Sequence, residues 1–120
     1  MRYRTSRNRV EVQVNSLTSL TNLETLRLLE VVIVGEPFKS LSKLKELKIK
    51  FCDFKISSEN VFAGLTSLET LTSIECKNSH HLLYSPHLDQ LISMTAAKCD
   101  DLNILKKLPK HLRNFSINLA

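Results

Sequence analysis

The chain has 120 residues, of which 42% are hydrophobic and 24% charged, and it carries a net charge of +5. This composition suits one domain with its own hydrophobic core and argues against intrinsic disorder. No run approaches the roughly 18 apolar residues of a membrane-spanning helix, and 2 glycines and 3 prolines are too few for a fold built on many tight turns.

The first nine residues are the most basic segment of the chain. They contain Arg2, Arg4, Arg7 and Arg9 and no acidic residue. A secretory signal would continue with an apolar run of roughly 7–15 residues, whereas VEVQV alternates apolar and polar residues. We therefore expect a solvated basic tail over 1–9 and a cytoplasmic protein, with a nucleic-acid-binding arm or a targeting segment as alternatives.

Beyond this tail, leucines recur at an unusual spacing of three, three and then two residues. The first copy has Leu20, Leu23, Leu26 and Leu28, followed by Val31. A step of three drifts around a helix by roughly 60° each time and changes face in a strand. Three more copies and two partial ones follow the pattern: Leu41, Leu44, Leu47, Ile49, Cys52; Leu68, Leu71, Ile74, Cys76, Ser79; Leu88, Leu91, Met94, Ala96, Cys99; and, in part, Val10, Val12, Asn15 and Leu108, Leu112, Phe115, Ile117.

The repeated pattern L-x-x-L-x-x-L-x-L-x-x-N/C resembles the leucine-rich repeat family from about residue 10 to the end. The resemblance implies an α/β fold, a horseshoe-shaped solenoid with a parallel β-sheet on the concave face. Short helices, 3₁₀ turns or loops would cover the convex face. Residues 10–120 would form one domain of about five to six repeats without caps at its ends. The alternative is a helical bundle rich in leucine.

Two convex segments carry helix signals. Ser57 or Ser58 can cap a short helix through ENVFA that ends at Gly64, and Ser85 can cap another that begins at Pro86. In this family the N/C residue follows the strand and satisfies backbone groups of the turn. Here those positions would be held by Asn15, Val31, Cys52, Ser79 and Cys99.

The sequence offers little for catalysis or metal binding. It has no Gly-rich phosphate loop and no G-x-S-x-G or H-E-x-x-H motif, so we expect neither an enzyme nor a cofactor. The three cysteines are more than twenty residues apart, which favours buried free thiols over a zinc site. The histidines, with His80 and His81 adjacent, are expected to be solvated.

Function would then depend on the concave face, where this family binds proteins. The residues beside the inward pair of each strand point into that face. Arg27 and Lys48 would share a row with Glu75, which would relieve their repulsion. An acidic patch on a partner would fit the basic middle of the face. The candidate binding residues are Arg27, Glu46, Lys48, Lys50, Ser73, Glu75, Lys77 and Thr95.

The style of the repeats suggests a branch of the family. LKELKIKFCDF and AAKCDDLNILKKLPKHLRNFSI resemble intracellular plant immune receptors with nucleotide-binding domains, whereas VFAGLTSLETL resembles Toll-like ectodomains. We expect a protein–protein interaction module of innate immunity, a fragment or sensor piece of a larger receptor-like protein, with self-association through uncapped ends and no membrane contact. The alternative is nucleic-acid or polyanion binding through the basic tail and the lysine-leaning face, but no aromatic side chain is interleaved there for base stacking.

Overall fold

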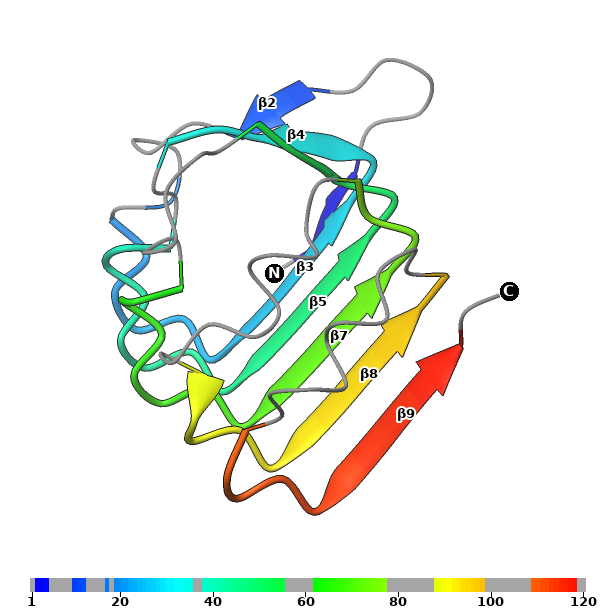
Figure 1. The fold of residues 1–120 in the computed structure, drawn as a ribbon. Coiled ribbons are helices and arrows are strands. Elements are labelled where there is room, and N and C mark those ends of the chain that lie inside the picture. Colours follow the sequence, from blue (N-terminus) through cyan, green and yellow to red (C-terminus); the bar gives the residue numbers. More distant parts are fainter. Residues whose placement is uncertain are drawn as a thin grey trace.

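Parallel strands dominate the fold, which is a repeat solenoid in the computed structural model of the chain (Figure 1). The structure describes residues 2–4, 10–12, 17, 19–35, 38–55, 62–77, 88–98 and 109–118. Within them, six strands form the main sheet in the order β1-β3-β5-β7-β8-β9. Their bounds are β1 Arg2–Arg4, β3 Thr25–Leu29, β5 Glu46–Lys50, β7 Thr70–Ile74, β8 Ser93–Ala97 and β9 Asn114–Asn118.

Two rows of side chains run across the main sheet on the side of the core. Because side chains alternate along a strand, residues two apart face the same way, and parallel pairing stacks equivalent residues at about 4.8 Å. This arrangement explains the step of two in the sequence pattern. The first inward row is Leu26, Leu47, Leu71, Met94 and Phe115, and the second is Leu28, Ile49, Ser73, Ala96 and Ile117.

The step of three has its own structural cause in the segments that lead into each strand. Successive turns are closed by bonds from an N–H to the carbonyl three residues earlier, as at Leu20 to Leu17 (3.0 Å) and Leu23 to Leu20 (3.1 Å). In such turns residues three apart lie on one side. The same bonds recur at Leu41, Leu44, Leu65, Leu68, Leu91 and Leu112. The leucines that recur at every third residue of these segments are therefore all turned toward the core.

Sharp corners end four of the strands at the same position. Glu30, Phe51, Glu75 and Lys98 each follow the last residue of a strand and have φ between 50° and 57°. Non-glycine residues seldom adopt this left-handed conformation. The stacking of successive solenoid turns stabilises this backbone conformation. The backbone N–H groups of Glu30, Phe51 and Glu75 each donate to a carbonyl of the next turn, at 2.9–3.0 Å.

A second, three-stranded sheet lies across the core from the main sheet, in the order β2-β4-β6 (Figure 1). Its strands are β2 Val10–Val12, β4 Val31–Ile33 and β6 Asp53–Phe54, and a parallel bridge joins Asp53 to Lys77. The three residues of β4 are all buried. Hydrophobic side chains from both sheets and from the turns therefore share one core.

Three phenylalanines fill the part of the core beneath the turns. Phe38 and Phe62 stack with ring centroids 6.0 Å apart, and Phe54 meets Phe62 edge-on at 6.3 Å. Gly64 allows the turn 62–64 to approach the turn 38–40. A Cβ at Gly64 would lie 2.5 Å from the carbonyl oxygen of Lys39, so no side chain fits there.

The structure corrects the sequence-based account of the N-terminal region. Residues 2–4 do not belong to a solvated tail, because they form strand β1 beside β3. Val10–Val12 is not a strand of the main sheet, since it pairs with β4 in the second sheet. Residues 5–9 and Asn15 lie outside the described residues, as does most of each expected helix; of those segments the structure describes turns at 62–64 and at 89–90.

Candidate functional site

The face of the main sheet that is turned away from the core, here called the outer sheet face, carries three rows of side chains. Strands β3 to β9 pair in register over five residues each, so each row crosses all five strands. The rows are Thr25, Glu46, Thr70, Ser93, Asn114; then Arg27, Lys48, Thr72, Thr95, Ser116; and finally Leu29, Lys50, Ile74 and Ala97, with Asn118 at the corresponding register position of β9.

Five of the eight sequence-predicted binding residues do lie in these rows: Arg27, Glu46, Lys48, Lys50 and Thr95. Four of them share the two neighbouring strands β3 and β5, while Thr95 lies on β8. Arg27 is exposed and the other four are half-buried. The structure thus brings the predicted basic residues together on one part of the face.

The other three predicted residues lie elsewhere, because the repeat pattern predicts Ile74 and Cys76 as the inward pair of this strand, whereas the inward pair is Leu71 and Ser73, three residues earlier. Ser73 occupies the inward position beside Leu71 and is fully buried. Glu75 is the corner residue after β7, and Lys77 reaches the second sheet through its bridge to Asp53. The face residues that β7 supplies instead are Thr70, Thr72 and Ile74.

A signal for the correct alignment was present in the sequence. The residue five positions after the first inward residue is Val31 after Leu26, Cys52 after Leu47 and Cys99 after Met94. The same offset from Leu71 leads to Cys76, not to Ser79. An inward serine obscured the pattern, because Ser73 breaks the apolar spacing while Ile74 restores it one residue later.

Charge is concentrated on β3 and β5. The guanidinium of Arg27 lies 4.0 Å from the carboxylate of Glu46, and both side chains are about half exposed (55% and 44%), so this ion pair contributes little stability. Lys48 pairs in register with Thr72 and Lys50 with Ile74. Glu75 is therefore absent from the row of Arg27 and Lys48, and the expected relief of their repulsion by Glu75 is wrong.

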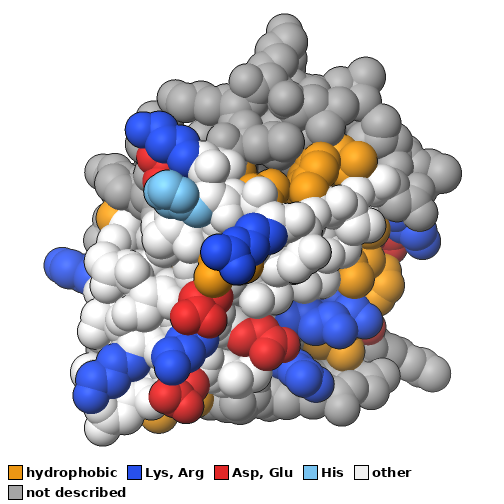
Figure 2. All heavy atoms as spheres, turned by 90° about the horizontal axis from the view of Figure 1, so that it is seen from below, with side chains coloured by type: hydrophobic (Ala, Val, Ile, Leu, Met, Phe, Trp, Pro, Cys, Tyr) orange, Lys and Arg blue, Asp and Glu red, His pale blue; other side chains and the backbone are white. Residues whose placement is uncertain are grey.

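An open hollow of about 360 Å³ lies where β3 and β5 end. It is lined by Arg27, Leu28, Leu29, Glu30, Lys48, Lys50 and Phe51. The cations therefore border a recess whose lining is part polar and part apolar. In Figure 2, which looks at the molecule from below, charged side chains gather in the lower half of the view, beside a broad white area of uncharged side chains and backbone.

Two thiols stack inside the solenoid at equivalent positions of neighbouring turns. The Sγ of Cys52 donates to the carbonyl oxygens of Lys50 (3.3 Å) and Leu28 (3.6 Å). That of Cys76 donates to those of Ile74 (3.5 Å) and Ile49 (3.6 Å). Each cysteine thereby satisfies a carbonyl of its own strand and one of the preceding turn, which is the structural role that the N/C position implied.

The two thiols also influence each other's ionisation. The neighbouring Cys52 thiol hydrogen-bonds the Cys76 thiolate and lowers the pKa of Cys76 to about 7, although burial acts in the opposite direction. The same contact, together with burial, raises the pKa of Cys52 far above its ordinary range. The pair therefore holds at most one negative charge near neutral pH.

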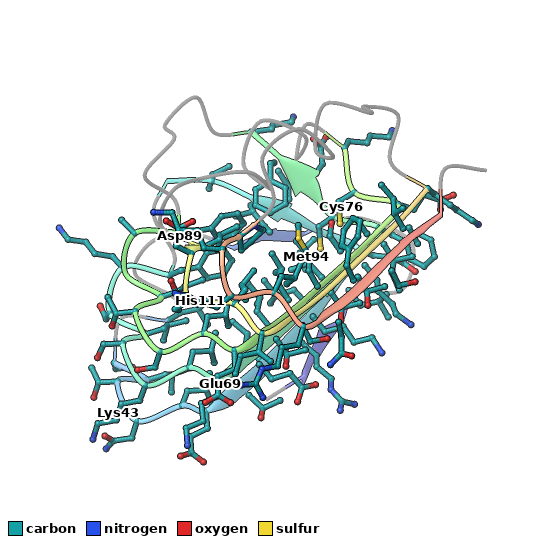
Figure 3. All side chains as sticks on the ribbon, turned by 60° about the horizontal axis from the view of Figure 1, so that its bottom comes forward. Lys43, Glu69, Cys76, Asp89, Met94 and His111 are labelled. Atoms are coloured by element: carbon teal, nitrogen blue, oxygen red, sulfur yellow. The ribbon has the colours of Figure 1, made fainter. Side chains whose placement is uncertain are left out.

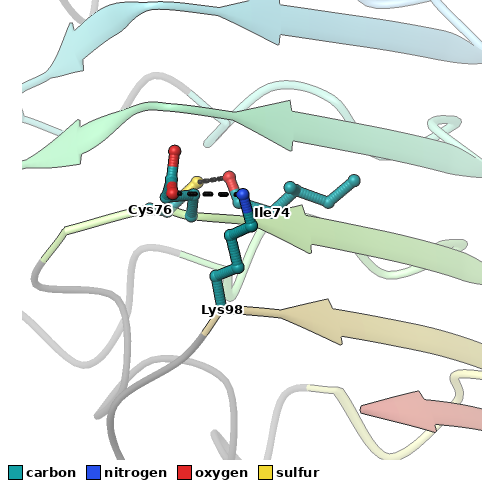
Figure 4. A network of polar contacts seen from close by, with 4 residues as sticks. Ile74, Cys76 and Lys98 are labelled. Atoms are coloured by element: carbon teal, nitrogen blue, oxygen red, sulfur yellow. Dashed lines mark hydrogen bonds and ion pairs between the residues drawn. The ribbon is translucent and has the colours of Figure 1, made fainter. Parts of the chain in front are cut away.

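The side chain of Cys76 points into the core, and a surface ion pair lies next to it. Figure 3 shows Cys76 and Met94 turned into the interior while Lys43 and Glu69 project outward. The carboxylate of Glu75 pairs with Lys98 at 3.5 Å on the surface beside Cys76 (Figure 4). Within the described part of the chain, no three His, Cys, Asp or Glu side chains are grouped closely enough to hold a metal ion.

Among the described residues there is no helix with the length and apolar character needed to span a bilayer. Comparison with family models, with curated proteins and with solved structures gave no match to this chain.

Proposed function

We propose that this chain is a protein-binding module and that the outer sheet face contacts the partner. The observation that carries the proposal is the set of three continuous side-chain rows, which run in register from β3 to β9. None of these side chains is needed for the core, which lies on the opposite side of the sheet. Their variety from strand to strand suits recognition more than packing.

Rigidity supports the same proposal. The face rests on two inward rows that are mostly apolar and, from β3 to β8, buried, and each inner strand is hydrogen-bonded on both sides. A partner that binds to a preformed surface loses less conformational entropy than one that must order a loop. The sheet therefore provides a pre-organised platform.

We further propose that the module belongs to the leucine-rich repeat family and forms the sensor piece of a larger, intracellular receptor-like protein of innate immunity. The repeated spacing, the closed turns and the cysteines at the position after the strand support this assignment. Cys52 and Cys76 are free thiols, which fits a reducing compartment.

Selection from a random peptide library tests the proposal without assuming a partner. Binders would be selected on the 120-residue chain and then measured on two variants by fluorescence anisotropy. Thr72→Tyr/Thr95→Tyr places bulk in the middle row, and Ser42→Tyr/Ser67→Tyr places the same bulk on exposed turns outside the sheet. We expect the first variant to lose at least about tenfold in affinity, equivalent to about 1.4 kcal/mol, and the second to bind like the parent. Equal binding by both variants would refute a role of the face.

A further inference from the structure

The cationic end of the outer sheet face lies on the neighbouring strands β3 and β5. Register pairing places Arg27 beside Lys48 in the middle row and Leu29 beside Lys50 in the third row. Arg27, Lys48 and Lys50 all line the hollow at the end of these strands. Three basic residues from two separate repeats therefore belong to one region of the sheet.

Within the described residues, the three cationic side chains of this end, Arg27, Lys48 and Lys50, outnumber its two carboxylates, Glu30 and Glu46. Glu46 faces Arg27 at 4.0 Å, and Glu30 lines the hollow. Lys48 and Lys50 have no ion pair among the described residues, and their register neighbours on β7 are uncharged. Both lysines are half-buried, so water screens their charge less fully than on an open surface.

The other end of the face has a different chemistry. The first two rows continue on β7, β8 and β9 with hydroxyl and amide side chains only: Thr70, Ser93, Asn114, Thr72, Thr95 and Ser116. These groups can donate and accept hydrogen bonds but carry no charge. The face is thus divided along the rows into a cationic end and a neutral, hydrogen-bonding end.

The size of the face limits what can bind there. Five strands at 4.8 Å spacing measure about 19 Å across, and five residues measure about 16 Å along a strand. The resulting flat area of about 300 Å² is well below the roughly 800 Å² per partner of a standard protein interface. An extended peptide of about six residues spans the same 19 Å. The face therefore fits a segment of a protein better than a broad globular surface.

We propose that the partner inserts an extended segment whose clustered Asp or Glu residues lie over β3 and β5 and whose uncharged polar residues continue over β7, β8 and β9. This inference depends on the proposed function and specifies the chemistry and the orientation of the partner. The charges of the cationic end meet the acidic cluster, and the hydroxyl rows pair with its uncharged continuation.

Defined peptides provide the test. The probe is a fluorescein-labelled peptide of four glutamates followed by four serines, and its comparison peptide has the same residues in alternation. Lys48→Glu/Lys50→Glu reverses two charges of the cationic end. Lys43→Glu/Lys110→Glu makes the same change at exposed positions outside the rows. Circular dichroism would verify that all variants keep the fold of the parent.

We expect the block peptide to bind the parent chain more tightly than the alternating peptide. Its affinity should fall at least about tenfold in the Lys48→Glu/Lys50→Glu variant and less than about twofold in the control. Equal affinities for the two peptides would overturn the divided arrangement. Equal losses in the two charge variants would overturn the assignment to β5.

Two further outcomes separate this inference from its alternatives. An eight-residue oligothymidylate that binds as tightly as the block peptide, and competes with it, would show that the cationic end is a polyanion site and would refute a protein segment. If library-selected peptides lose affinity for Thr72→Tyr/Thr95→Tyr but not for Lys48→Glu/Lys50→Glu, the face binds a partner of other chemistry. The proposed function would then stand while this inference fails.

Discussion

Ser73 is the register partner of Ile49 in the second inward row of the main sheet, and it is completely buried. Among the described residues, its hydroxyl oxygen has no hydrogen-bond partner. A buried hydroxyl without a partner costs free energy, because it gives up its bonds to water and gains none in return. The solenoid therefore contains a weak point at its centre.

Replacing Ser73 by alanine should stabilise the protein. Alanine already occupies the next position of this row, at Ala96, so the smaller side chain fits the sheet. We expect the free energy of unfolding to rise by about 1 kcal/mol, measured by urea denaturation. Ser93→Ala, at a half-exposed position of β8, is the control and should stay within about 0.5 kcal/mol of the parent. A loss of stability in Ser73→Ala would mean that the hydroxyl has a partner in solution.

Adjacent residues of β5 should respond very differently to the same substitution. Leu47 is fully buried, and Lys48 is half-buried on the outer sheet face. Leu47→Asp places an unpaired carboxylate in the core and should cost more than about 3 kcal/mol, whereas Lys48→Asp should change stability by about 0.5 kcal/mol or less. Circular dichroism with urea titration would measure both. Similar losses would contradict the orientation of β5.

Gly64 should not tolerate even a methyl group. The Cβ of Gly64→Ala would lie 2.5 Å from the backbone oxygen of Lys39 and 2.7 Å from that of Phe38. Two backbone turns would have to separate, so we expect a loss of about 1–3 kcal/mol and a lower Tm in differential scanning fluorimetry. Ser67→Ala, on an exposed part of the same connection, is the matched control. An unchanged Tm in Gly64→Ala would show that these turns are not in contact.

Cys76 should be alkylated at a lower pH than an ordinary thiol. Folding lowers its pKa from 9.0 to about 7, so its reactive thiolate forms as the pH rises through about 7. The stabilisation linked to this ionisation is complete above pH 9 and is lost as the pH falls through about 7. Peptide mass spectrometry after brief iodoacetamide treatment should give a labelling midpoint near pH 7 for Cys76 and almost no labelling of Cys52.

The comparison variant for this prediction is Cys52→Ala. It removes the thiol that stabilises the Cys76 thiolate, so the midpoint for Cys76 should move upward toward 9. A midpoint near 9 in the parent chain would contradict the proximity of the two thiols. Rapid labelling of Cys52 in the folded protein would contradict its burial.

The periodicity of the leucines was enough to predict the solenoid of parallel strands and most of its core. Leu47 and Ile49, for example, face inward as the step of two required, and Leu41 and Leu44 lie on turns as the step of three required. Arg27, Glu46, Lys48 and Lys50, four of the predicted binding residues, lie on the adjacent strands β3 and β5. Their role in binding stays a prediction.

The sequence by itself determined which residues repeat, because burial of an aliphatic side chain in every turn leaves a spacing that can be read directly. It did not determine the alignment at Ser73, where a buried polar residue interrupts that spacing, nor the place of Arg2–Arg4. Only the tertiary structure decided these, because a three-residue strand has no periodicity of its own and is defined by the backbone hydrogen bonds that β3 offers. Strand pairing likewise places Arg27 of β3 beside Lys48 of β5, and so brings together basic residues that are distant in the sequence.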